Sequence, residues 1–306
     1  MSPRRIATLA ACALVALVAL PAPRALAGIG DLYVTSDASN LVRQYAGTTG
    51  AFQTVFTTSF AASGQLGIHF GAANNRVLVG HWGGGVEEFD ATSGAYIKTY
   101  NPGAGTCWAG IYAPTGGVYV GCWTTGDVRE YDATTGAFIR VVTTINTPAD
   151  MRLGPGGRLF IASYNGGIVM AVNAVSGAPM GIWVPPAPSQ PNDIAILPGG
   201  QMLVTCMRTD SVYRFSPTFA LLGAFASPGW INPHGIDISP SDGRIYIAEG
   251  AAGQVHVFDP VTFAELNPAY LSPAPGDKIV DLEFRPDPGP TPARRSSWGR
   301  IKRLYR

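Results

Sequence analysis

The sequence predicts an all-β fold, a six-bladed β-propeller made of four-stranded antiparallel blades. The main observation is a short apolar strand that recurs six times, at steps of 45, 41, 41, 43 and 43 residues. Turn motifs recur with it in a fixed order, and no other repeat length is visible. A period of about 40–50 residues built from strands is typical of propellers, with one blade in each repeat. The six strands are Leu32-Tyr-Val, Val77-Leu-Val, Val118-Tyr-Val, Leu159-Phe-Ile, Met202-Leu-Val and Ile245-Tyr-Ile.

Each repeat contains the elements of one blade in order. A first apolar strand ends in a Pro-Gly turn, as in 151–157 and 194–200, because Pro presets one turn dihedral and Gly accepts a positive φ. The recurring second strand is β-branched and aromatic, which suits a strand packed on both faces. A third strand closes with an Asp-x-x-x-Gly turn, as in 89–94 and 131–136, and a fourth strand follows, as in 137–142.

The two ends of the repeat region complement each other. The chain enters the repeat on a second strand at 32–36, and it finishes on an unpartnered first strand at 279–286. We expect these two strands to pair, so that the C-terminal strand closes the ring. Closure would remove two open sheet edges, which otherwise favour aggregation. Residues 28–289 then form one domain.

The N-terminal segment 1–27 has the pattern of a secretory signal. Arg4 and Arg5 precede an apolar run from Ile6 to Leu20, and Ala25-Leu-Ala27 supplies small residues for cleavage. The apolar run is short for a membrane-spanning helix. We therefore expect an exported protein, either secreted or held in the periplasm or cell envelope.

Charge divides the rest of the chain into two parts. Residues 28–289 carry 12 basic against 20 acidic residues, a net charge of −8, which argues against nucleic acid as a partner. The tail 290–306 carries six basic residues and no acid. It is either a cationic amphipathic anchor for an anionic envelope surface or a frayed terminus. Nothing in the pattern requires an oligomer, and we expect a monomeric propeller.

The apolar strand, Pro-Gly-Gly turn, Leu-Tyr-Val-like strand and Phe-Asp-x-x-Thr-Gly turn together resemble NHL-repeat propellers. They are also similar to YVTN-type and gluconolactonase-like six-bladed relatives, over about residues 29–286. The resemblance implies an architecture more than an activity, because such propellers include calcium-dependent lactonases, lyases and binding scaffolds. It implies a Glu/Asn/Asp calcium set in the channel, of which this chain lacks the early Glu.

Carboxylates gather where the first strands begin. Alignment of these strands places Asp150, Asp193 and Asp281 at one level, with Asn192 and His234 one position earlier. Such oxygen ligands suit calcium, the possible cofactor. Alternatively, the carboxylates accept backbone N–H groups and have a purely structural role. A zinc site is less consistent with the pattern, because the histidines occupy nonequivalent positions.

Aromatic residues follow three consecutive second strands at one equivalent position. Trp82, Trp123 and Tyr164 would lie on the same face as the carboxylates, with His81, Trp230 and His234 nearby. Rings in a row can stack on sugars or on peptide side chains. The alternative is that they fill the wedges between blades.

Three cysteines remain after the signal, and two of them lie on the arms of one hairpin. Cys107 and Cys122 are placed for a disulfide in an oxidising compartment, or they are two buried thiols.

Three functions fit these patterns. The first is an exported binding propeller that recognises a peptide, glycan or protein on its channel face. The second is a metal-dependent hydrolase or lyase of the gluconolactonase-like type, so the sequence leaves open whether the chain is an enzyme. The third is a structural envelope protein tethered by its tail.

Overall fold

The computed structural model describes residues 28–58, 64–71, 74–101, 105–271 and 278–287. The expected signal segment (1–27) and basic tail (290–306) lie outside these residues. Within them, no helix has the length and apolar character needed to cross a membrane. The helix η1 (Met207–Thr209) spans three residues, and the rest of the regular structure is strand.

The strands form antiparallel sheets. The first sheet joins the two ends of the described chain in the order β24-β1-β2-β3, with bounds β24 (Ile279–Phe284), β1 (Leu32–Ser36), β2 (Leu41–Tyr45) and β3 (Phe52–Thr58). The second sheet has eight strands: β4 (Gln65–Gly71), β5 (Arg76–His81), β6 (Val86–Asp90), β7 (Tyr96–Tyr100), β8 (Cys107–Tyr112), β9 (Val118–Cys122), β10 (Asp127–Tyr131) and β11 (Phe138–Thr144).

The remaining three sheets have four strands each, paired in chain order. They are β12 (Pro148–Gly154), β13 (Arg158–Ser163), β14 (Ile168–Asn173) and β15 (Pro179–Trp183); β16 (Pro191–Ile196), β17 (Met202–Cys206), β18 (Ser211–Phe215) and β19 (Leu221–Phe225); and β20 (Pro233–Ile238), β21 (Ile245–Glu249), β22 (Gln254–Phe258) and β23 (Glu265–Asn267).

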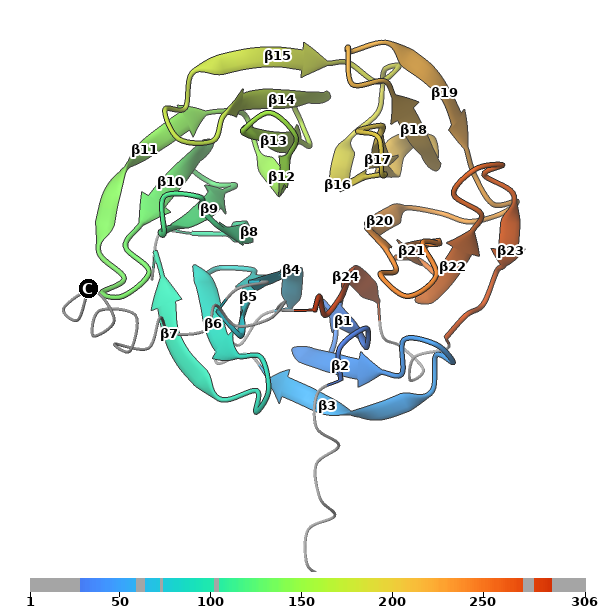
Figure 1. Cartoon of the computed structure of the whole chain (residues 1–306), viewed down its shortest axis with the longest axis horizontal. Coiled ribbons are helices and arrows are strands. Elements are labelled where there is room, and N and C mark those ends of the chain that lie inside the picture. Colours follow the sequence, from blue (N-terminus) through green and yellow to red (C-terminus); the bar gives the residue numbers. More distant parts are fainter. Residues whose placement is uncertain (1–27, 59–63, 72–73, 102–104, 272–277, 288–306) are drawn as a thin grey trace, which may run out of the picture.

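The sheets stand around a central axis as a propeller-like ring (Figure 1). Strands β4, β8, β12, β16, β20 and β24 lie at the centre, and β3, β7, β11, β15, β19 and β23 form the rim. The recurring second strands β1, β9, β17 and β21 are buried along their whole length. Their apolar, β-branched sequence follows from this position, because each strand is covered on both faces by neighbouring sheets.

The two ends of the domain pair as the sequence predicts. Strand β1 is antiparallel to β24, with Leu32 opposite Phe284 and Val34 opposite Leu282. The backbone N–H of Asp281 donates to Oγ1 of Thr35 at 3.1 Å. The first and last strands of the described chain therefore belong to one sheet.

The eight-stranded sheet differs from the expectation of separate four-stranded sheets. Its halves, β4 to β7 and β8 to β11, are joined through the pair His81–Cys107 between β5 and β8. A glycine allows this approach, because a Cβ on Gly80 would lie 2.0 Å from the carbonyl oxygen of Trp108. The repeat spacing contains no signal for this junction, which depends on how closely two neighbouring backbones approach.

Candidate functional site

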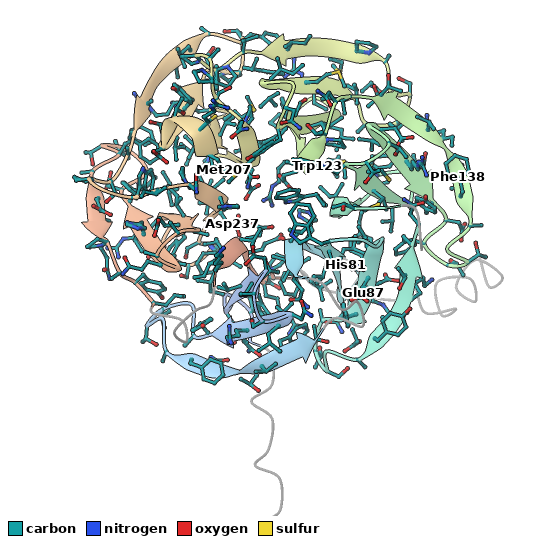
Figure 2. All side chains as sticks on the ribbon, turned by 180° about the vertical axis from the view of Figure 1, so that it is seen from behind. His81, Glu87, Trp123, Phe138, Met207 and Asp237 are labelled. Atoms are coloured by element: carbon teal, nitrogen blue, oxygen red, sulfur yellow. The ribbon has the colours of Figure 1, made fainter. Side chains whose placement is uncertain are left out.

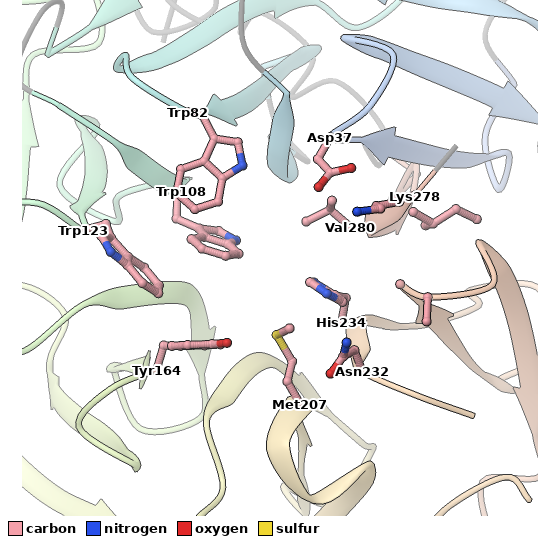
Figure 3. Close-up of a pocket in the computed structure, with 13 residues that line it drawn as sticks. Asp37, Trp82, Trp108, Trp123, Tyr164, Met207, Asn232, His234, Lys278 and Val280 are labelled. Atoms are coloured by element: carbon pink, nitrogen blue, oxygen red, sulfur yellow. The ribbon is translucent and has the colours of Figure 1, made fainter. Parts of the chain in front are cut away.

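A cavity of about 530 Å³ opens at the end of the ring where the central strands begin. One wall is aromatic, and the opposite wall mixes polar and apolar residues (Figure 3). The aromatic wall consists of Trp82, Trp108, Trp123 and Tyr164. The opposite wall is called the polar wall here after its polar side chains, Asp37, Asn232, His234 and Lys278, and it also contains Met207, Gly250, Ala251, Ile279 and Val280. Ligand sites of this kind combine apolar area with a few placed polar groups.

The aromatic wall is built around Trp108, which belongs to β8. Its ring stacks on Trp123 at 4.7 Å between centroids and meets Trp82 edge-on at 5.4 Å. Tyr164 lies 5.1 Å from Trp123. Trp108 is buried against Leu66, Ala149 and Val280 from other central strands, whereas 39% of Trp82 is exposed. The rings therefore fill the core and line the cavity at once, and Trp82 offers the most open aromatic surface.

The polar wall presents a neutral histidine. Burial lowers the pKa of His234 to about 4, so its imidazole is uncharged near neutral pH. Nδ1 of this ring is buried and has no hydrogen-bond partner within the described ranges. The ring packs on a glycine, since a Cβ on Gly250 would lie 2.4 Å from Cδ2 of His234. A buried unpaired polar atom is unfavourable, so Nδ1 is suited to receive a partner from a ligand or a water.

Asp37 and Lys278 bring opposite charges to the same wall. Asp37 follows β1, and its backbone N–H donates to the carbonyl of Lys278 at 3.3 Å. Burial raises the pKa of Asp37, and the ammonium of Lys278 partly opposes this shift. Oδ1 of Asp37 is buried without a hydrogen-bond partner among the described residues. The wall thus offers a ligand one carboxylate oxygen, one imidazole nitrogen and one ammonium.

Two of the three carboxylates that the sequence placed at this level, Asp193 and Asp281, bind backbone N–H groups. Asp193 accepts the N–H of Ile236 with Oδ2 and that of Ile194 with Oδ1, both at 2.6 Å. Asp281 repeats the pattern, accepting from Ile68 at 2.8 Å and from Leu282 at 2.7 Å. Each aspartate therefore ties its central strand to the first strand of a neighbouring repeat. This matches the structural alternative for Asp193 and Asp281.

Asn192 is buried and Asp150 is half-buried, and neither residue lines the cavity. Burial, reinforced by the neighbouring carboxylate of Asp193, raises the pKa of Asp150 well above its usual value. Oδ2 of Asp150 and Oδ1 of Asn192 have no hydrogen-bond partner in the part of the chain that the structure describes. The guanidinium of Arg152 lies 3.7 Å from both Asp193 and Glu283 and offsets part of the negative charge.

The backbone uses part of the bonding capacity of these carboxylates. Calcium takes six to eight oxygen ligands. Each of the four oxygens of Asp193 and Asp281 accepts one backbone N–H group and keeps one further lone pair. Asp150 and Asn192 leave two free oxygens between them. Over the described ranges, no group of three or more His, Cys, Asp or Glu side chains is arranged to hold a metal ion.

Of the six residues expected to bind ligand, Trp82, Trp123, Tyr164 and His234 line the cavity. His81 does not. It is buried, with Nε2 3.8 Å from Oε1 of Glu87 (Figure 2). Trp230 was also expected to contact ligand, but it does not line the cavity. Its side chain is 5% exposed, and Nε1 donates to the carbonyl of Asp210 at 2.6 Å. Its ring packs on Phe258 and His256, so it fills the core.

Sequence reasoning did not select Met207, Asn232 or Lys278 as ligand contacts. Met207 could have been selected from the sequence, because it follows Cys206 just as Trp123 follows Cys122. Both residues therefore occupy the same position after a second strand of the repeat. Asn232 and Lys278 lie just before central strands, in connections whose paths the repeat does not fix.

The cysteine pair lies beside the aromatic wall. Cys107 and Cys122 face each other across β8 and β9 as thiols, with their sulfurs 3.3 Å apart. Cys206 is buried in another sheet, where burial raises its pKa.

Comparison with solved structures places the ring among β-propellers. A chain in the crystal structure of a nidogen/laminin complex aligns with this one at a TM-score of 0.71, covering 84% of this chain and 99% of that chain. The sequence identity is 10%, so the similarity shows the fold alone. No family model and no curated protein matches the chain. The narrower resemblance to NHL and gluconolactonase-like propellers stays a prediction.

Proposed function

We propose that this chain is an exported binding propeller that holds a peptide segment of a protein partner in the cavity. The carrying observation is the pairing of an aromatic wall with a polar wall whose buried polar atoms, Nδ1 of His234 and Oδ1 of Asp37, lack partners among the described residues. A peptide supplies apolar side chains for the rings, and backbone N–H and C=O groups for these polar atoms. The similar propeller chain described above comes from the crystal structure of a complex between two proteins.

We also propose that the ring counts as six blades. The eight-stranded sheet is then two blades, since β5 and β8 are linked through one residue pair. The pairing of β1 with β24 supports closure of the ring by the C-terminal strand. Six central strands would then meet at the cavity.

The binding proposal is tested with Trp82→Ala. Peptides selected from a displayed library on the wild-type chain should bind this variant about tenfold more weakly, the loss of one partly exposed ring from a binding face. The matched control is Phe138→Ala, because Phe138 is 55% exposed and lies on the outer rim, away from the centre (Figure 2). Isothermal titration measures both affinities. Equal affinity for Trp82→Ala and wild type would reject the cavity as the binding site, and selective capture of glycans on an array would replace the peptide as ligand.

Export and the tail are parts of the proposal with their own tests. Mass spectrometry of the secreted chain should show removal of residues 1–27. If the tail is an envelope anchor, a chain that ends at residue 289 should move from the membrane fraction to the supernatant. Unchanged fractionation would reject the anchor and leave the binding proposal intact.

The calcium-dependent alternative has its own test in metal analysis of the purified chain. One bound calcium per chain would favour it over a metal-free binding propeller.

A further inference from the structure

The Cys107–Cys122 pair has the placement of a cross-strand disulfide. The two residues are register partners on antiparallel strands, and both are fully buried. Directly opposed residues in such a ladder have Cα atoms about 4.5–5.5 Å apart, inside the range that disulfides span. The sulfurs are 3.3 Å apart, so bond formation requires them to approach by about 1.3 Å.

The surroundings hold the two sulfurs together in the folded chain. Nδ2 of Asn101 donates to both sulfurs at 3.1 Å, and Arg129 holds the amide in place through Oδ1 at 3.3 Å. The Cys107 thiol also donates to the sulfur of Cys122.

The pair is continuous with the aromatic wall. Cys107 precedes Trp108 and Cys122 precedes Trp123, and these two rings stack at 4.7 Å with 27° between their planes. Cys107 is also the residue that pairs with His81 where the two halves of the large sheet meet. A bond between the sulfurs would fix the backbone spacing directly beneath the stacked indoles.

We propose that Cys107 and Cys122 form a disulfide during export, and that this bond holds Trp108 and Trp123 in their stacked arrangement. The bond rests on the export that is part of the proposed function, and its value for ligand binding rests on the proposed binding role. Cys206 stays a thiol, because it lies in a different sheet from the pair.

The reaction uses the disulfide of an exported thiol oxidoreductase as oxidant. The Cys107 thiolate attacks that disulfide, which forms a mixed disulfide and releases one thiolate of the oxidant. The Cys122 thiolate then attacks the Cys107 sulfur and releases the second. The chain loses two electrons and two protons, and the oxidant becomes a dithiol. Because both cysteines are fully buried in the folded chain, the exchange takes place before the hairpin packs.

The bond is tested by counting thiols in the exported chain. The protein is denatured with N-ethylmaleimide present and no reductant, and its intact mass is measured. We expect one adduct, on Cys206, and three after reduction, since the described chain contains three cysteines. Cys206→Ser should give no adduct without reductant, and Cys107→Ser should give two. Three adducts on the unreduced wild type would overturn the proposal. The count is made on denatured protein, so it remains valid for a variant that folds poorly.

The positioning effect is tested by near-ultraviolet circular dichroism, which reports coupling between stacked indoles. Cys107→Ser should lose part of the tryptophan signal, whereas Cys206→Ser should keep it. An unchanged spectrum in Cys107→Ser would overturn the positioning effect. Neither measurement uses a ligand, so a failure here is separate from a failure of the binding proposal.

Discussion

Replacement of Asp193 by alanine tests the idea that the channel carboxylates hold neighbouring sheets together. In the structure, Oδ2 of Asp193 reaches from β16 to the N–H of Ile236 on β20 at 2.6 Å. Oδ1 accepts the N–H of Ile194 at the same distance. Both donor residues are buried, so Asp193→Ala leaves two N–H groups without these acceptors in a region closed to solvent.

The expected loss follows from these contacts. A hydrogen bond to a charged group contributes about 1.5–3 kcal/mol, and a buried donor left unpaired costs about 1–3 kcal/mol. Two such donors give an expected destabilisation of about 3–5 kcal/mol, a large part of the stability of an ordinary domain. For a domain of this size, the melting temperature should fall by about 6–20 °C.

The assay is urea unfolding followed by far-ultraviolet circular dichroism. Asp281→Ala should behave alike, because its carboxylate makes the equivalent bonds to Ile68 and Leu282. Asp242→Ala is the matched control, with a partly exposed carboxylate that pairs locally with Arg244, and it should change stability by less than about 0.5 kcal/mol. A loss below about 1 kcal/mol in Asp193→Ala, or one that requires calcium and disappears with a chelator, would refute the structural role.

Two further predictions concern the histidine of the polar wall and the junction between β5 and β8. The pKa of folded His234 is about 4, below the unfolded value near 6.5, so protonation favours unfolding and stability falls as pH drops through this window. The stability advantage of wild type over His234→Asn, measured by urea unfolding, should therefore shrink by about 3 kcal/mol between about pH 7 and pH 4, and a constant difference would contradict the assignment. Gly80→Ala places a Cβ 2.0 Å from a backbone oxygen of Trp108 and should cost more than about 2 kcal/mol in the same assay. Gly199→Ala, which meets no atom within 4 Å but has φ of +95°, should cost about 1 kcal/mol; equal losses at the two sites would show that the junction is not tightly packed.

The sequence predicted the ring of sheets because the same strand and turn patterns recur in every repeat. Each apolar second strand, such as 118–122, can be recognised from its own residues, and the regular spacing of these strands indicates their order around an axis. The pairing of Leu32 with Phe284 was predictable for the same reason, since each end lacked a partner that the other supplied. The aromatic wall was predictable because Trp82 and Trp123 occupy the same position in successive repeats, and residues at the same repeat position lie on the same face of the ring.

Other features depend on contacts between repeats, which the spacing does not encode. Trp230 was expected on the binding face, but its indole turns into the core to reach the carbonyl of Asp210. The carboxyl groups of Asp193 and Asp281 were expected at one level, and they are, yet their partners are amides of neighbouring central strands. A one-dimensional alignment places a residue on a face without giving the direction of its side chain.

The use of these carboxylates determines what chemistry is left for the cavity. The carboxylate oxygens of Asp193 and Asp281 accept backbone N–H groups of neighbouring strands. Burial favours the neutral form of Asp150. The scaffold therefore uses part of the acidic composition of the body. The polar atoms that face the cavity belong to the neutral ring of His234 and to Asp37, opposite Trp82. A ligand bound there would be selected by hydrogen bonds and by shape, as the proposed binding role requires.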